Sequence, residues 1–242
     1  MNGIKLILYN KIGHLIALLF GQKGAKYFFE HQYWRFKWIM EGRRFSNDHY
    51  QWVFEDGFGL NQQYYEGKKI IDIGCGPRGS LEWVPKSTLA YGLDPLANDY
   101  LKLSKGKHRM TYVAAGAEAI PFENDYFDVV SSFNSLDHVD DLEASLKEIY
   151  RILKPGGDFL LITDIHEKPA LCEPIAIDWD ISAQLALNFS NRFEKRLKRK
   201  SKIYKSIREA EAYDGQEYGI LMGHFIKKLK SSDLERFPSN TH

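Results

Sequence analysis

The stretch of this chain best suited to chemistry is a glycine-rich loop that follows a run of isoleucines. The apolar run at residues 70–73 indicates the end of a buried strand, because such strands are typically short apolar runs followed by turn residues. Gly74, Gly76 and Gly79 then satisfy the pattern G-x-G-x-x-G. These glycines allow a sharp turn and the close approach of a ligand that a Cβ atom would exclude. The pattern predicts a nucleotide-type cofactor on the main chain, with a plain turn as the alternative.

An acidic residue after the second predicted strand adds to this prediction. Residues 88–93 form that strand, and Asp94 ends it twenty positions after Gly74, where a carboxylate can accept hydrogen bonds from ribose hydroxyls. Two cofactors use such a crevice: a nicotinamide dinucleotide, whose pyrophosphate rests on a helix N-terminus, and S-adenosylmethionine, which has no phosphate. Asp72 places a second carboxylate beside the loop, where it would repel a pyrophosphate but suit an ammonium and a sulfonium. The two acids therefore favour the cationic ligand.

Residues 66–165 resemble a class I S-adenosylmethionine-dependent methyltransferase of the small-molecule type. The resemblance rests on the Asp-x-Gly-x-Gly loop, on Asp94, and on residues 116–122, which correspond to the family segment Asp-Ala-Glu-x-Leu-Pro-Phe. Relatives often carry an Asp that faces the adenine amino group where this chain has Gly116, so adenine recognition is expected from the backbone near Ala117 and from Glu118. The cofactor-binding residues that the resemblance implies are Asp72, Gly74, Cys75, Gly76, Asp94, Pro95, Ala117, Glu118 and Asn134.

Two further loops should lie on the same edge of the sheet as the glycine loop. Residues 134–138, Asn-Ser-Leu-Asp-His, follow a predicted strand over 126–133, and residues 164–166, Asp-Ile-His, follow one over 158–163. Open α/β sheets bind their ligands at the carboxyl ends of the strands. The candidate catalytic residues on the acceptor side are His138, Asp137 and His166. A capped loop without chemistry is the alternative, and no metal site is predicted.

The order of the expected strands and helices that position these loops predicts a Rossmann-like, doubly wound α/β fold with a mostly parallel sheet. Strands are expected at residues 70–73, 88–93, 110–114, 126–133 and 158–163. A helix is expected from a cap at Asp140 or Asp141 to a stop at residues 155–157, Pro-Gly-Gly. Residues 181–189 then predict a helix and residues 219–229 a last strand, which would complete the antiparallel C-terminal hairpin of the resembling family.

The region before the first strand differs in composition from the rest. We therefore expect an N-terminal helical, aromatic-rich extension over residues 1–65 and a methyltransferase domain over residues 66–242. Residues 4–20 have apolar side chains at helical spacing, which predicts an amphipathic helix on the domain, on a second subunit or on a membrane surface. Its longest apolar run, residues 15–20, is far shorter than the roughly 20 residues that cross a bilayer, so no transmembrane anchor is predicted.

Aromatic residues are concentrated between positions 27 and 58. Twelve of them occur there, and basic residues alternate with several of them. In the resembling family, segments before the first strand commonly cover the acceptor site as a lid. Packing in the core is the alternative, and stacking on nucleic acid is the least favoured interpretation because the chain lacks the signatures of nucleic-acid-binding folds.

Composition restricts the function further. The 242 residues are 44% hydrophobic, enough for one sizeable core, and the net charge of +1 gives no general attraction to nucleic acid. Two cysteines, Cys75 and Cys172, are too few for a disulfide framework and favour a cytoplasmic location. Residues 192–208 carry nine basic residues and one acid, which suits either a solvated face or a patch for an anionic partner.

The resemblance implies transfer of a methyl group from S-adenosylmethionine to a small organic acceptor, with S-adenosylhomocysteine as the product. Such an in-line displacement needs the two reactants to be aligned, and a base only when the acceptor must lose a proton. Two alternatives stay open, a nicotinamide-dependent oxidoreductase and a non-catalytic S-adenosylmethionine-binding subunit. A homodimer and a peripheral membrane contact through residues 4–20 also stay open, and the sequence does not identify the acceptor.

Overall fold

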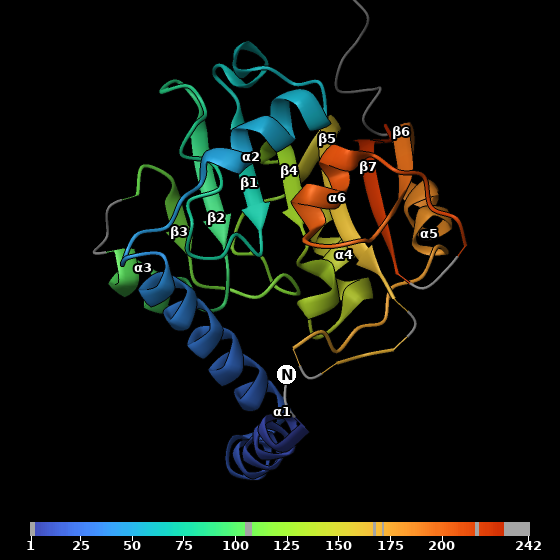
Figure 1. Cartoon of the computed structure of the whole chain (residues 1–242). Coiled ribbons are helices and arrows are strands. Elements are labelled where there is room, and N and C mark those ends of the chain that lie inside the picture. The colour runs from blue at the N-terminus through green and yellow to red at the C-terminus, as the bar shows by residue number, and fades with distance from the viewer. Residues whose placement is uncertain (1–2, 105–107, 167, 171, 216–217, 230–242) are drawn as a thin grey trace, which may run out of the picture.

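A single mixed sheet forms the centre of the protein. The fold is taken from a computed structural model, which describes residues 3–104, 108–166, 168–170, 172–215 and 218–229, with side chains from Gly21 onward except that of Ser104. Seven strands lie in the order β3-β2-β1-β4-β5-β7-β6 (Figure 1). Strands β1 to β5 are parallel, and β7 runs antiparallel to β5 and β6. The expectation of a Rossmann-like sheet with an antiparallel C-terminal hairpin is confirmed.

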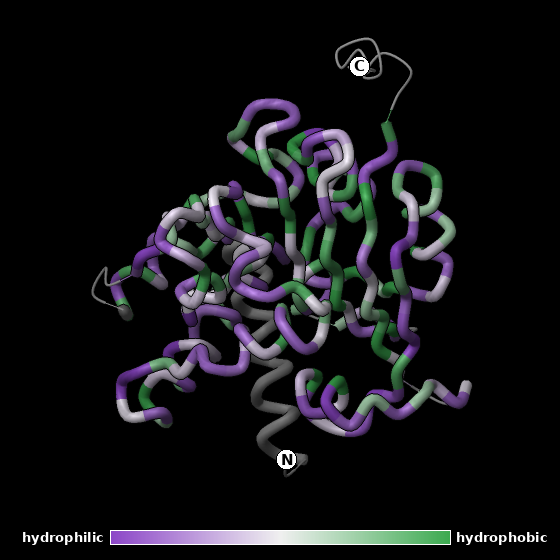
Figure 2. The backbone as a smooth tube through the Cα atoms, turned by 90° about the horizontal axis from the view of Figure 1, so that it is seen from above, coloured by the Kyte–Doolittle hydropathy of each residue, from purple (hydrophilic) through white to green (hydrophobic). Residues whose placement is uncertain are grey.

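The strands form where short β-branched and apolar runs lie between turn residues. Their bounds are β1 Lys69–Ile73, β2 Leu89–Leu93, β3 Thr111–Val113, β4 Phe127–Phe133, β5 Leu153–Ile165, β6 Phe189–Lys198 and β7 Gly219–Lys227. The central strands β1, β4 and β7 are buried along almost their whole length, as strands covered on both faces must be. Figure 2 shows the same pattern, with hydrophobic residues along the central strands and hydrophilic residues in many of the outer loops.

Helices and helical turns flank the sheet and its edges. Their bounds are α1 Gly3–Met40, α2 Asp48–Trp52, η1 Val53–Gly57, η2 Gln62–Tyr65, α3 Ala97–Ser104, η3 Leu136–His138, α4 Leu142–Ile152, α5 Ile181–Asn188 and α6 Ile203–Glu209. The expected cap of α4 is present, because the Asp141 side chain accepts a hydrogen bond from the Ala144 amide at 3.0 Å.

Helix α1 lies across the end of the sheet toward which the parallel strands point (Figure 1). The helix expected over residues 4–20 is its first part, and Gly21, with φ 73° and ψ 170°, interrupts it. The surface on which residues 4–20 pack, whether the domain, a second subunit or a membrane, stays a prediction. Among the described residues, no helix is long and apolar enough to cross a membrane.

Two hydrophobic clusters pack on opposite faces of the sheet. One contains side chains of α4 and α5, among them Ile149 and Leu185. The other contains residues from the segment 53–65 and from α6, including the fully buried Phe54. The later part of the aromatic segment is therefore core, and only its earlier part, in α1 and α2, is available for a lid.

The crossover from β1 to β2 contains no helix. Residues 74–88, all of which the structure describes, form consecutive turns. Arg109 holds them by donating hydrogen bonds to the carbonyl oxygens of Pro85 and Leu81, at 3.1 and 3.2 Å. The segment 53–65 covers the face of the sheet that a crossover helix would otherwise cover. Consequently no helix N-terminus follows the glycine loop.

The expected end of α4 was wrong by a few residues. The helix ends at Ile152, and Leu153 already pairs with Phe127 of β4. The Pro-Gly-Gly sequence at 155–157 lies within β5, where the register between β4 and β5 shifts. The glycines therefore accommodate a strand irregularity. Gly and Pro can either end a helix or accommodate a bulge in a strand, and the sequence position alone does not distinguish these two roles.

The basic segment near the C-terminus forms the edge of the sheet. Residues 192–208 lie in β6, in α6 and in the short connection between them, and ion pairs join several of their basic side chains to nearby acids. These pairs are Arg196–Glu194, Lys198–Asp214, Arg199–Asp164, Lys200–Glu211 and Lys205–Glu209. Neutralised charges on an edge strand favour the solvated face over a patch for an anionic partner.

Candidate active site

A cavity of about 520 Å³ opens at the carboxyl ends of β1, β2 and β4. This is where the chain order of the sheet reverses, since β2 lies on one side of β1 and β4 on the other. Residues of α1, α2 and α6 close the cavity from the opposite side. Eight of the nine cofactor residues implied by the sequence line it: Gly74, Cys75, Gly76, Asp94, Pro95, Ala117, Glu118 and Asn134. The size is that of a pocket for a nucleoside-sized ligand with room for an acceptor.

The glycine loop closely approaches other side chains at two positions. Gly74 has φ +70°, and a Cβ there would lie 2.3 Å from the Cβ of Ser135 in the loop after β4. Gly76 has φ +56°, and its Cβ would point at the Trp34 ring, 3.4 Å from the nearest ring atom. The main chain at Gly76 therefore forms part of the cavity wall, as close binding of a cofactor requires.

Asp72 lies behind the loop and does not line the cavity. Only 3% of its surface is exposed, and its carboxylate accepts hydrogen bonds from the hydroxyls of Ser80 and Ser131 at 2.5 and 2.7 Å. Burial raises its pKa to about 6, although both hydroxyls oppose the shift. Its observed contacts tie β1 to β4 and to the turn at Ser80, so any effect on a ligand would pass through the position of the loop.

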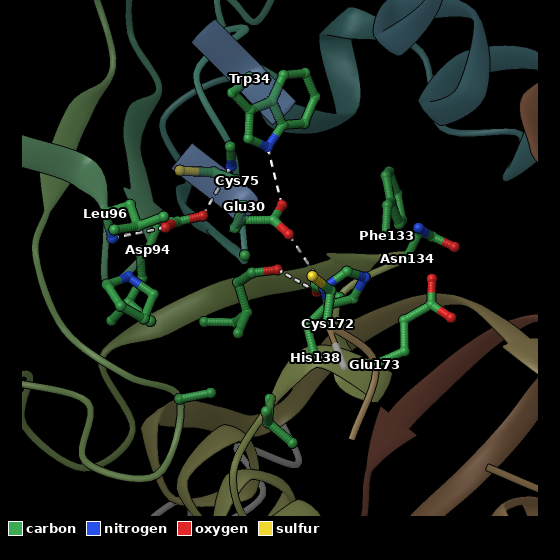
Figure 3. Close-up of a pocket in the computed structure, with 18 of the residues that line it drawn as sticks. Glu30, Trp34, Cys75, Asp94, Leu96, Phe133, Asn134, His138, Cys172 and Glu173 are labelled. Atoms are coloured by element: carbon green, nitrogen blue, oxygen red, sulfur yellow. Dashed lines mark hydrogen bonds and ion pairs between the residues drawn. The ribbon is translucent and has the colours of Figure 1, made fainter. Parts of the chain in front are cut away.

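Asp94 occupies the position expected of a ribose-binding acid. Its carboxylate accepts hydrogen bonds from the amides of Leu96 at 2.8 Å and Gly76 at 3.2 Å (Figure 3). A carboxylate has about four acceptor sites, so others are left for ligand hydroxyls. Burial raises its pKa to about 6, against the effect of the two amides.

The raised pKa of Asp94 predicts a pH dependence of cofactor binding. We expect the affinity for S-adenosylhomocysteine to be constant above about pH 7 and to fall below about pH 6, because protonation removes an ionic acceptor. Calorimetric titrations across this range would measure it. The Asp94→Asn variant should show a weaker but flatter profile, and an unchanged affinity of the wild type at about pH 5 would contradict the assignment.

The charges around the cavity favour a cationic ligand. Glu30, Asp94, Glu118 and Glu173 line it. The lining cations are engaged elsewhere, since Lys26 pairs with Asp140 and Arg78 with Glu41. The loop also lacks the helix N-terminus on which a pyrophosphate would rest. The site therefore fits an ammonium and a sulfonium better than a dinucleotide.

The segment expected near adenine is fixed by α4. The Glu118 carboxylate accepts hydrogen bonds from the Asp140 and Asp141 amides at 2.6 and 3.3 Å, at the N-terminus of the helix. A Cβ at Gly116 would lie 2.5 Å from a carboxylate oxygen of Glu118. Glu118 therefore occupies the space beside Gly116, where relatives often carry an Asp.

Asn134 has a strained backbone at the end of β4. Its φ of 56° is uncommon for a residue other than glycine, and its amide donates to the Ile162 carbonyl at 2.6 Å. Its side-chain oxygen is buried without a hydrogen-bond partner among the described residues, and the residue lines the cavity. A strained residue with an unpaired polar atom is typical of a ligand contact.

The three candidate catalytic residues lie together, but only His138 lines the cavity. Its Nδ1 is 3.7 Å from Glu30 of α1 (Figure 3). Its Nε2 is 3.8 Å from Asp137. Asp137 and His166 are buried behind it, with 1% and 5% of their surfaces exposed. His166 Nε2 lies 3.7 Å from Asp137, and the pKa of His166 is raised mainly by that carboxylate.

Several lining residues were not among the named candidate site residues, although two of them lie in the segment 27–58 that was expected to form a lid. They are Glu30 and Trp34 of α1, Tyr204 of α6, and Cys172 and Glu173 between β5 and α5. Trp34 donates a hydrogen bond to Glu30 at 3.0 Å, as their spacing of four residues on one helix allows. Burial raises the pKa of the Cys172 thiol to about 11, which makes it a poor nucleophile.

Known methyltransferases are similar to the part of the chain that contains the parallel strands. Residues 71–161 match the family model described as a methyltransferase domain. The ubiquinone/menaquinone biosynthesis C-methyltransferase UbiE of Vibrio parahaemolyticus is 34% identical over 124 residues, covering 47% of this chain and 47% of that protein. The chloroplastic tocopherol O-methyltransferase of Arabidopsis thaliana is 30% identical over 121 residues, covering 47% of this chain and 35% of that one.

A solved structure shows the same fold. The geranyl diphosphate C-methyltransferase of Streptomyces coelicolor A3(2), in complex with Mg²⁺, geranyl-S-thiolodiphosphate and S-adenosyl-L-homocysteine, superposes with a TM-score of 0.51 at 15% identity. The match covers 66% of this chain and 69% of that one. Residues 71–161 therefore form a methyltransferase domain, and the chain has the fold of methyltransferases that use S-adenosylmethionine. The alignment spans less than half the length of the two sequence relatives described above.

Proposed function

We propose that the chain transfers a methyl group from S-adenosylmethionine to a small organic acceptor. The observation that carries the proposal is the cavity itself, with the glycine loop and Asp94 in one part and Glu30 and His138 in another. The cofactor supplies an electrophilic methyl group on a sulfonium. The chain would hold the methionine part along residues 74–76 and the ribose at Asp94, and so direct the methyl group toward the acceptor.

The acceptor side is proposed to act by orientation and proton removal. His138 reaches the cavity and lies between two carboxylates, those of Glu30 and Asp137. In its neutral form it can accept a proton from an acceptor, and the carboxylates would stabilise the resulting imidazolium. Phe29, Tyr33 and Phe133 supply apolar and aromatic surface for an organic molecule.

The proposal is tested against its two alternatives by binding and by turnover. Calorimetric titration should show binding of S-adenosylhomocysteine and none of NAD or NADP, because no helix N-terminus follows the loop. Tighter binding of either nicotinamide cofactor would support the oxidoreductase instead. Incubation with methyl-labelled S-adenosylmethionine and a small-molecule extract should label a product. Cofactor binding without any labelled product would favour the non-catalytic subunit.

We also propose that the first part of the aromatic segment is the lid. Residues 26–34 of α1 line the cavity, and the Trp34 ring stands over Gly76 and contacts Tyr100 edge to face at 6.5 Å. Trp38 and Trp52 do not line the cavity. The extension over residues 1–65 would thus combine a cover for the site with a cover for the sheet.

Trp34→Leu tests the lid. A lid role predicts that S-adenosylhomocysteine dissociates roughly fivefold faster, as expected for about 1 kcal/mol of lost aromatic contact, with an unchanged melting temperature. Stopped-flow displacement and a thermal melt would measure both. Trp38→Leu, on the same helix but outside the cavity, should leave dissociation unchanged. A lowered melting temperature with unchanged dissociation would instead make Trp34 a packing residue.

A further inference from the structure

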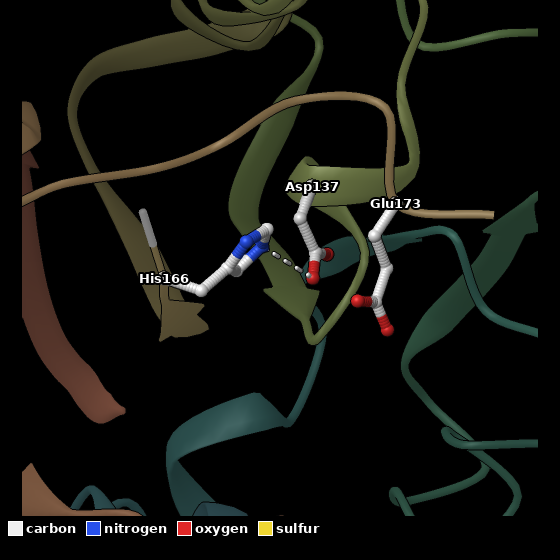
Figure 4. A group of neighbouring side chains, drawn as sticks. All are labelled: Asp137, His166 and Glu173. Carbon is white, nitrogen blue, oxygen red and sulfur yellow. Dashed lines mark ion pairs between the residues drawn. The ribbon is translucent and has the colours of Figure 1, made fainter. Parts of the chain in front are cut away.

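Three side chains that could bind a metal ion meet beside the acceptor end of the cavity. Asp137 comes from η3, His166 follows β5, and Glu173 belongs to the segment between β5 and α5 (Figure 4). One potential ligand atom from each lies within 4.8 Å of the others. Glu173 also lines the cavity, so the cluster adjoins the space proposed for the acceptor.

The carboxylate of Asp137 is buried without a hydrogen-bond donor. Neither of its oxygens has a hydrogen-bond partner among the described residues, and only 1% of the residue is exposed. The imidazole nitrogens of His166 and His138 approach it at 3.7 and 3.8 Å. Both separations are too long for a hydrogen bond. A buried carboxylate without donors is strongly disfavoured, which indicates that another ligand of positive charge belongs here.

The tautomer of His166 directs a lone pair at the same point. Its Nδ1 lies 3.0 Å from the carbonyl oxygen of Lys168, which can only accept a hydrogen bond. Nδ1 must therefore carry a proton. In the neutral ring Nε2 is then unprotonated, and Nε2 is buried without a hydrogen-bond partner among the described residues. A ring fixed by a backbone carbonyl on one nitrogen is the usual state of a metal-binding histidine.

The distances suit a metal ion better than a direct contact. Two ligand atoms at about 2.1 Å from an ion can be up to about 4.2 Å apart, and the 3.7 Å gap between His166 Nε2 and Asp137 lies within that limit. Glu173 is half-buried on a loop, so a small rotation of its side chain could close the remaining gap.

We propose that Asp137, His166 and Glu173 bind a divalent transition-metal ion such as Mn²⁺ or Zn²⁺. One imidazole and two carboxylates favour such ions over Ca²⁺, which prefers oxygen ligands alone. Three protein ligands leave further coordination positions open. Binding of the ion does not depend on methyl transfer, but its role rests on the proposed function.

In that role the ion would act on the acceptor. Its charge would favour loss of a proton from an acceptor hydroxyl, and His138 or water would take that proton. The oxygen lone pair then forms the bond to the methyl carbon while the carbon–sulfur bond breaks, and its electrons stay on sulfur.

The test is titration of metal-stripped protein with Mn²⁺ and with Zn²⁺, in the absence of cofactor and acceptor. The wild type should bind one equivalent of at least one of them, and its melting temperature should rise with metal concentration. Glu173→Gln and His166→Gln should weaken binding by at least about tenfold. Asp140→Asn, an acid in the same loop that pairs with Lys23 and Lys26, is the matched control and should bind as the wild type does.

Two results would overturn the site. One is the absence of stoichiometric binding to folded wild-type protein. The other is equal binding by the wild type and Glu173→Gln, which would place the metal elsewhere. Glu173→Gln is the safer variant for folding because its side chain lies on a half-buried loop, and a thermal melt confirms folding. Metal binding with no labelled methyl product would sink the proposed function and leave the metal site standing.

Discussion

Replacing Gly76 with valine should abolish measurable binding of S-adenosylhomocysteine. A Cβ at this position would enter the space between the loop and Trp34, and the two methyl groups of valine would fill it. The φ of +56° adds backbone strain, since a left-handed conformation costs roughly 1–2 kcal/mol for residues other than glycine. Calorimetric titration would measure the loss.

The strain and the steric block can be separated with a second glycine. Gly67 has φ +70°, a Cβ added there would meet no atom within 4 Å, and the residue lies before β1 away from the cavity. Gly67→Val should therefore lower the melting temperature but keep cofactor affinity. Cys75→Ala should also bind nearly as the wild type does, because the thiol packs against Gly92 of β2. Normal affinity in Gly76→Val would remove the loop from the cofactor site.

Asp94→Ala should weaken S-adenosylhomocysteine binding by roughly 30- to 1,000-fold. Charge-assisted hydrogen bonds to two ribose hydroxyls correspond to about 2–4 kcal/mol. The variant also removes the acceptor of the Gly76 amide, so part of the loss would come from a less ordered loop. Asp94→Asn keeps one side-chain oxygen and should lose less.

A thermal melt identifies how much of the Asp94 effect is structural. If disorder of the loop were the main cause of the weaker binding, Asp94→Ala would fall below Asp94→Asn in melting temperature as well as in cofactor affinity. A change of less than about threefold in Asp94→Ala would exclude the carboxylate from ribose binding.

The cofactor half of the site could be predicted because its signals are local. The glycine loop and Asp94 each follow a short apolar strand, and parallel strands bring their carboxyl ends to one edge. The partners of His138 could not be predicted in this way. Glu30 is 108 positions away, on a helix that crosses the sheet edge, and nothing in its own surroundings indicates that contact.

The limits of local signals are also visible at α4 and Glu173. Pro155 suggested a helix stop, but pairing of Leu153 with β4 ended the helix earlier, since tertiary hydrogen bonds outweigh local preference. Glu173 lies in an irregular segment without periodicity, and only the fold brings it to Asp137 and His166. A metal cluster of this kind has no fixed spacing in sequence.

The cover formed by residues 53–65 also bears on the order in which the protein can fold. Phe58 stacks on Phe133 with ring centroids 5.5 Å apart, and Gly57 lies against Met222 of β7. During synthesis the apolar side chains of this early segment cannot be buried until β4 and β7, which come later in the chain, have been made. Contacts across such sequence distances slow folding, because a large loop must close before they form. The apolar side chains of residues 53–65 are therefore exposed on the nascent chain until those strands have been made, and in that interval they can associate with other chains.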